Sequence, residues 1–324
     1  MNPDASAAVS DPRLLIVPQV SQSYGHLSKE CRATVAACPE IRSISHVVSN
    51  TVVFAVREAD AVPFPTGMSW EDEADTEGRP GRRLVRWVLE TDEAMRALDV
   101  GYLMRTLVVT PEGGMQCSRL HSAQYLVGIS PSGPGCDAMD TTMNRLVTKI
   151  RTGRQMVDEL PGGRPGEVKE PLVQGSSLFM HVLSRDAQEA QRLRGIWHRH
   201  LNPRDLHYAA YYRDWSLVCS GDAFEHQELE DSFAVVSVAA RRAIYRDLVS
   251  RLREQLTDLA GIMAPVTRAP IRRLVLDVVD GAFYMHWLGD AAGDFVVGVT
   301  FRQPQVAVAE ERLLDLIAEV RVPH

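Results

Sequence analysis

The sequence contains no apolar run that approaches the roughly 18 residues a helix needs to cross a lipid bilayer. Its first apolar run, at residues 14–17, stops at Pro18, and no basic segment precedes it. A secretory signal has a basic segment followed by an apolar stretch, so this pattern argues against one. We therefore expect a cytoplasmic protein that is not inserted in a membrane.

Cysteine is also scarce, and its spacing suits neither disulfides nor a metal ion. The five cysteines are an odd number and include no CxxC pair: Cys31, Cys38, Cys117, Cys136 and Cys219. A disulfide framework needs paired cysteines, and a cysteine zinc site needs closely spaced ones. The pattern is typical of a reducing compartment, and we expect no metal.

The sequence further lacks the signatures of nucleic-acid binding and of common catalytic sites. Its net charge of -7 repels a phosphate backbone, and no Lys/Arg run is interleaved with aromatic residues. No G-x-S-x-G segment surrounds a serine nucleophile. The segment SPSGPGCD at residues 130–137 lacks the Lys-Ser/Thr ending of a P-loop and predicts a surface turn. We expect neither a nucleic-acid partner nor a cofactor.

What is present is a chain of ordinary globular composition, with 45% hydrophobic and 24% charged residues, long enough at 324 residues for two domains. Four strand-like segments of its first half recur in the same order in its second half. The pairs are LLIVPQ and SLFMHV (from residues 14 and 177), IRSISHVVSNTVVF and LHYAAYYRDWSLVC (41 and 206), TLVVTPEGG and RLVLDVVDG (106 and 273), and YLVGIS and FVVGVT (125 and 295). The preserved order predicts an internal duplication.

Turns and helices fit the same scheme. The second pair predicts two strands around a polar turn, at Ser49-Asn50 and at Arg213-Asp214. A closing helix in each half has an apolar stripe, at residues 143, 146, 147 and 150 and again at 313, 316, 317 and 320. Further helices are predicted at 82–98 and 244–259, and the acidic, Gly/Pro-bearing stretch 71–81 is predicted as a solvated loop.

These elements predict an α/β fold of the α+β type, built from two similar modules in tandem. Each module has a mainly antiparallel sheet with helices in the order strand, helix, two strands, helix, three strands, helix. The first module is predicted at 1–151 and the second at 172–324. Residues 152–171, rich in Gly, Pro and charge, form the predicted linker.

This order of elements resembles the roadblock family of dynein-light-chain-like modules. The residues that carry the resemblance close each half: LVVTPEGGMQCSRLHSAQYLVGIS before the helix around Met143, and LVLDVVDGAFYMHWLGDAAGDFVVGVTF before the helix around Leu313. The extra first strand of each half departs from the simplest roadblock pattern and leaves a profilin-like module as an alternative. The resemblance implies a scaffold or regulator of small GTPases whose two copies form a pseudo-twofold dimer within one chain.

Reactive side chains are densest at residues 195–215, where a candidate polar site consists of His198, His200, His207 and Asp214. His198 and His200 are two residues apart, so a helix points them in different directions, whereas metal ligands on a helix need a spacing of three or four. The Asn202-Pro203 pair indicates a helix end near His200, where the helix dipole favours cations and a histidine needs no chemistry.

Aromatic residues make up only 6% of the chain and gather in its second half. Six of them form a candidate interaction surface, with a larger core as the alternative: Trp197, Tyr211, Tyr212, Trp215, Tyr284 and Trp287. The leading hypothesis is a non-enzymatic interaction or regulatory protein without catalytic residues, which binds another protein such as a small GTPase or associates with itself. Its rival is an enzyme or small-molecule sensor that uses the polar site.

Overall fold

The computed structural model describes residues 11–16, 24–64, 73–157, 159–169, 178–289 and 291–322. In these residues the chain has an α+β fold of twelve strands, six α-helices and three short 3-10 helices. The strand pairs are antiparallel, as predicted. Counting strands and α-helices, the order strand, helix, two strands, helix, three strands, helix occurs twice along the chain.

The chain packs as two compact units. Unit 1 comprises Met1–Arg86, Glu112–Met156 and Ile262–Arg268, and unit 2 comprises Trp87–Pro111, Val157–Gly261 and Ala269–His324. Each unit therefore contains segments from both halves of the sequence. The module boundaries inferred from the sequence, with a linker at 152–171, stay a prediction.

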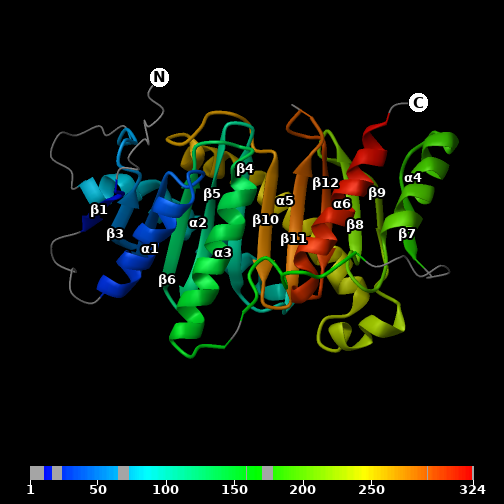
Figure 1. Ribbon diagram of the computed structural model, residues 1–324. Helices are drawn as coiled ribbons and strands as arrows, with labels where there is room; N and C mark the ends of the chain where they lie inside the picture. The colour runs from blue at the N-terminus through cyan, green and yellow to red at the C-terminus, as the bar shows by residue number, and fades with distance from the viewer. Residues whose placement is uncertain are drawn as a thin grey trace, which may run out of the picture. The chain divides into compact units, whose positions relative to one another are not determined.

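Unit 1 contains five strands in the order β1-β3-β2-β6-β5. The strands are β1 (Arg13–Ile16), β2 (Ser43–Val48), β3 (Thr51–Arg57), β5 (Gly113–His121) and β6 (Gln124–Ser130). Figure 1 shows α1 (Gly25–Ala37) and α3 (Cys136–Gly153) on the near face of these strands, with α2 (Glu73–Met95) behind them. The consecutive residues Val127 and Gly128 of β6 contact α2 and α3 respectively, because successive side chains on a strand point to opposite faces.

The start of α2 differs from the prediction. The stretch 71–81 was expected to be a loop because it contains Gly78, Pro80 and Gly81, but the helix already begins at Glu73 and includes all three. A Cβ at Gly78 would lie 2.5 Å from Val52 Cγ1, and one at Gly81 would lie 3.1 Å from Val127 Cβ. The glycines therefore let α2 approach the strands closely, and this packing outweighs their weak helix propensity.

Buried charge fixes the same part of α2 to unit 1. Glu77, on the first turns of α2, is 1% exposed and accepts hydrogen bonds from Arg42 at 3.0 Å and Arg57 at 3.2 Å. Arg42 also stacks on Phe64, with its guanidinium carbon 3.6 Å from the ring centroid. An acidic stretch that reads as solvated thus supplies a carboxylate that holds helix and sheet together.

Unit 2 contains seven strands in the order β4-β10-β11-β12-β8-β9-β7. The strands are β4 (Leu103–Thr110), β7 (Phe179–Val182), β8 (Tyr208–Arg213), β9 (Ser216–Asp222), β10 (Arg273–Val278), β11 (Gly281–Trp287) and β12 (Phe295–Thr300). Figure 1 shows α4 (Ala187–His200) and α6 (Val306–Arg321) in front and α5 (Val238–Met263) behind. The 3-10 helices η1 (Arg96–Leu98), η2 (Gln227–Phe233) and η3 (Gln303–Gln305) lie in connecting segments.

Local details of the two hairpins β2–β3 and β8–β9 coincide. A bulge interrupts the pairing after His46 and again after Tyr211, 165 residues later. Left-handed turn residues follow at Ser49 and Asn50 (φ 47° and 62°) and at Asp214 and Trp215 (φ 50° and 63°). The second turn thus lies one residue later than predicted. The spacing of 165 is that of the matched sequence segments.

The glycines of β6 and β12 also have the same role. Gly128 lies against Met143 of α3, and Gly298 lies against Leu313 of α6, each fifteen residues further on. The first strands differ from the sequence match, because Val56 pairs with Leu14 and Gly221 pairs with Met180. These pairings separate β1 and β7 by 166 residues, whereas the matched sequence segments are separated by 163.

None of the helices within the described ranges combines the length and the apolar composition needed to cross a bilayer.

Candidate functional site

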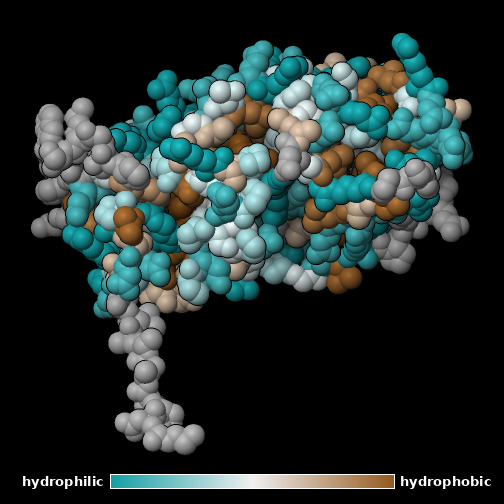
Figure 2. All heavy atoms as spheres, turned by 90° about the horizontal axis from the view of Figure 1, so that it is seen from above, coloured by the Kyte–Doolittle hydropathy of each residue, from teal (hydrophilic) through white to brown (hydrophobic). Residues whose placement is uncertain are grey.

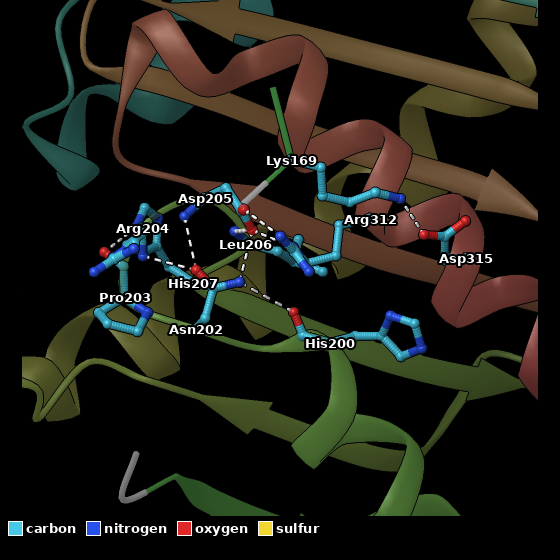
Figure 3. Close-up of polar contacts among 10 residues, drawn as sticks. All are labelled: Lys169, His200, Asn202, Pro203, Arg204, Asp205, Leu206, His207, Arg312 and Asp315. Atoms are coloured by element: carbon cyan, nitrogen blue, oxygen red, sulfur yellow. Dashed lines mark hydrogen bonds and ion pairs between the residues drawn. The ribbon is translucent and has the colours of Figure 1, made fainter. Parts of the chain in front are cut away.

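The most tightly bonded polar cluster lies in unit 2, where the loop after α4 meets α6 (Figure 3). Arg312 donates from Nε to Oδ1 of Asp205 at 2.6 Å and from Nη2 to Oδ2 at 2.8 Å. Asn202 adds a hydrogen bond from Nδ2 to Oδ1 of Asp205 at 2.7 Å. The Asp205 and Arg312 side chains are 4% and 6% exposed, so both charges depend on each other for solvation.

The local sequence explains why the loop folds around this cluster. The helix α4 ends at His200, and the chain leaves it in an extended conformation at Leu201. Asn202 then accepts the backbone N–H groups of Arg204 at 2.8 Å and Asp205 at 3.0 Å through its Oδ1, which is the turn that asparagine favours. Every polar atom of the cluster faces another protein atom, so the arrangement holds the loop and leaves no group for a ligand.

The four residues of the predicted polar site do not come together. His198 is exposed on α4, and Asp214 is exposed in the turn between β8 and β9. His200 is buried at the end of α4, with its Nε2 2.8 Å from Oε1 of Glu319 on α6. His207 is fully buried next to the Asp205 cluster. No common cavity unites these side chains in the described part of unit 2.

His207 is a structural histidine. The backbone N–H of Phe301 donates to its Nδ1 at 2.9 Å, so the proton sits on Nε2, which donates to the carbonyl of Pro203 at 3.0 Å. Burial lowers the pKa of His207 to about 4, so the ring is neutral at physiological pH. With both nitrogens engaged and no solvent access, this side chain cannot transfer a proton to a substrate.

The buried cysteines offer no nucleophile either. All five are buried, and burial raises the pKa of the Cys31 and Cys117 thiols above their usual range and that of Cys219 to about 12. Because the thiolate is the reactive form, these side chains act as small core residues. No three His, Cys, Asp or Glu side chains of the described ranges gather where they could hold a metal ion.

Of the six aromatic residues predicted as an interaction surface, five are buried: Trp197, Tyr211, Tyr212, Tyr284 and Trp287. Trp197 donates from its indole to the carbonyl of Ala209 at 2.9 Å, and Tyr284 donates from its hydroxyl to the carbonyl of Val306 at 2.7 Å. These bonds satisfy the polar atoms inside the core, as buried aromatic residues require. Trp215 is half-buried and is the member of the set most accessible to a partner.

Trp215 and Trp287 line one recess in unit 2, which we call the tryptophan pocket. Its volume is about 450 Å³. It is lined by Trp215, Arg253, Leu256, Thr257, Ala260, Pro270, Ile271, Trp287, Gly289 and Ala292. The α5 residues among them recur at intervals of three or four, so they share one face of the helix. This spacing is the signal in the sequence that could have identified them.

Hydrogen bonds hold the walls of the tryptophan pocket in place. The backbone N–H groups of Asp214 and Trp215 donate to Asp294 Oδ1 and to the Gly293 carbonyl, both at 2.9 Å. Trp287 donates from its indole to the carbonyl of Ala292 at 3.0 Å. The ring of Trp215 is tilted against the core residue Phe295, with 4.9 Å between centroids. The pocket is therefore built on the core and on a bonded hairpin tip.

Neither the protein-family models nor the curated proteins with which the chain was compared give a match.

Proposed function

We propose that the chain is a non-enzymatic interaction scaffold made of two roadblock-like modules, which regulates or assembles another protein of the small-GTPase class. The two halves share the order of their elements, the hairpin bulge, the left-handed turn and the Gly128 and Gly298 helix contacts. Shared details at equivalent positions support an internal duplication better than shared strand order alone.

The observation that carries the proposal is the pairing of β4 with β10 inside unit 2. In the sequence match Leu107 corresponds to Leu274, and Val108 to Val275. In the structure Leu107 lies opposite Val275, and Val108 lies opposite Leu274. Each residue thus faces the counterpart of its neighbour, which is the register of two equivalent strands around a local twofold axis. This register is the one expected if two modules pair as a pseudo-dimer.

Helices accompany the strand pairing, as they do in the pairing that the resemblance implies. Thr91 of α2 lies 3.4 Å from Gln255 of α5, oxygen to oxygen, within unit 2. The sheet and the helices of the two halves therefore meet through equivalent elements, which supports a scaffold whose surface is available to a partner.

The proposal is tested by measuring binding of the full chain to a panel of purified small GTPases, each loaded with GDP or with a non-hydrolysable GTP analogue. We expect saturable binding to at least one member with a preference for one nucleotide state. Binding to none of them, in either state, would contradict the GTPase part of the proposal.

Two matched variants separate specific docking from adventitious contact. Leu89 of α2 and Leu314 of α6 are exposed to similar extents, 44% and 47%, and lie on opposite faces of the unit 2 strands. Leu89→Glu and Leu314→Glu each place a charge on one face. A partner that docks on one face loses affinity with one variant and not with the other, whereas equal loss with both indicates non-specific binding.

A further inference from the structure

The tryptophan pocket has the composition of a small-molecule site. Its volume of about 450 Å³ falls within the range of roughly 300–1,000 Å³ typical of such sites, which are mostly apolar with a few polar groups. Leu256 of α5, Ile271 before β10 and the two indoles supply apolar walls from four separate segments. Figure 2 shows that hydrophobic side chains reach the molecular surface in small groups with hydrophilic ones between them, so a confined recess suits a small ligand.

Charge gives the pocket a polarity. The guanidinium of Arg253 lies over the ring of Trp215, 5.0 Å from its centroid, on the exposed side of α5. Among the described residues no carboxylate pairs with Arg253. Arg272 adds a second positive charge near the rim, where it donates to the carbonyl of Gly289, a lining residue. An apolar recess with arginine at its edge complements an apolar ligand that carries an anionic group.

The indole wall is particular to this hairpin. Trp215 occupies the second left-handed position of its turn, and the equivalent residue of the β2–β3 hairpin is Asn50. Asparagine suits that backbone conformation, whereas a bulky side chain there is an outlier. Such outliers cluster at ligand sites, where the surrounding structure holds them. Here the bonds from Asp214 and Trp215 to residues 293 and 294 provide that hold.

We propose that the tryptophan pocket binds a small aromatic carboxylate, with its ring against the apolar walls and its carboxylate on Arg253. This binding site is independent of the GTPase-directed function, because it requires only unit 2 residues and a free ligand. A peptide that carries the same groups would present the same chemistry, so free aromatic acids are the probe that isolates the small-molecule source.

The test is a titration of the full chain with 2-naphthoate and with its neutral counterpart 2-naphthamide, followed by calorimetry and by tryptophan fluorescence. We expect saturable binding of 2-naphthoate that is about tenfold tighter than that of 2-naphthamide, because a charge-assisted hydrogen bond is present with the acid alone. Equal affinities, or no binding of the acid, would overturn the proposal.

Variants on α5 locate the site. Arg253→Gln is expected to weaken 2-naphthoate about tenfold and to leave 2-naphthamide unchanged. Arg251→Gln is the matched control, because Arg251 is equally an exposed arginine of α5 but pairs with Asp247 at 2.8 Å and does not line the pocket. Equal effects of the two variants on 2-naphthoate would overturn the assignment of Arg253.

A third variant fills the pocket. Ala260 is an exposed α5 residue that lines the recess, so Ala260→Phe keeps a helix-compatible residue while occupying the space. We expect it to abolish binding of both probes while the thermal unfolding temperature stays unchanged. Undiminished binding by a folded Ala260→Phe protein would place the probes elsewhere and refute the proposal. The Arg253→Gln and Arg251→Gln pair decides the question if this variant does not fold.

Discussion

Asp277 is the residue whose ionisation is most affected by the fold. Its carboxylate is fully buried, with Oδ2 accepting from Arg105 Nε at 3.1 Å and from the Gly162 N–H at 2.6 Å. Burial raises the pKa of Asp277 to about 6, although Arg105, Gly162 and Gln303 each act to lower it. The side chain thus anchors the segment around Gly162 to β10 at the cost of solvating a charge.

This environment predicts a specific dependence of stability on pH. Because the folded pKa lies above that of the unfolded chain, the native state binds more protons between about pH 4 and pH 6. The free energy of unfolding contributed by Asp277 is therefore largest below pH 4 and is lost as pH rises through 6, by at most about 1.4 kcal/mol per pH unit. Urea unfolding of the wild type and of Asp277→Asn across pH 4–7.5 measures it.

The difference between the two proteins isolates Asp277, because all other titrating groups are shared. Asp277→Asn leaves the Arg105 charge without its partner and should be the less stable protein near pH 4.5, but its deficit should shrink as pH rises to 6.5. Parallel stability curves for the two proteins would show that the Asp277 carboxyl does not titrate in this range.

Single atoms also decide how closely α2 approaches unit 1. A Cβ at Gly78 would lie 2.5 and 2.7 Å from the two Cγ atoms of Val52, a β-branched residue with little rotamer freedom. Gly78→Ala should therefore lower the free energy of unfolding by about 1–2 kcal/mol, despite the better helix propensity of alanine. The matched control is Gly153→Ala at the end of α3, where a Cβ meets no atom within 4 Å. Denaturant unfolding should show the control unchanged or slightly stabilised.

At the scale of elements, the strands and hairpins could be predicted from the sequence because short apolar runs alternate with turn residues that few other structures accept. Ser49 and Asn50 tolerate the left-handed conformation and mark their hairpin directly. In the second hairpin Trp215 occupies a position that glycine or asparagine usually takes, so the predicted turn was placed one residue early.

The first turns of α2 could not be predicted, because Gly78, Pro80 and Gly81 normally interrupt helices. Their helical conformation depends on Val52 and Val127, which are far away in the sequence and become neighbours only after folding. The tryptophan pocket has the same origin. Trp215 and Trp287 were recognisable as candidate contact residues, but their meeting with Arg253 and Ile271 requires a hairpin, a helix and strand ends to converge.

For the whole molecule, the pairing of β4 and β10 bears on oligomeric state. If this pairing satisfies within one chain the edge that single modules use between chains, the protein should be a monomer. The outermost strands β1 and β7 are four residues each, and short edge strands resist edge-to-edge association. Light scattering after size exclusion should give a mass of 36.0 kDa that does not change with concentration. A mass of twice this value would show that another surface mediates dimerisation.

The left-handed conformation of Trp215 implies a conflict between durability and recognition. Holding an indole at φ 63° costs about 1–2 kcal/mol relative to a residue at ease there. The β2–β3 hairpin has Asn50 at the equivalent position and avoids that cost. Trp215→Asn should accordingly raise the melting temperature and abolish binding of 2-naphthoate. Selection for robustness alone would have removed this tryptophan, so its retention is the trace of a constraint other than folding.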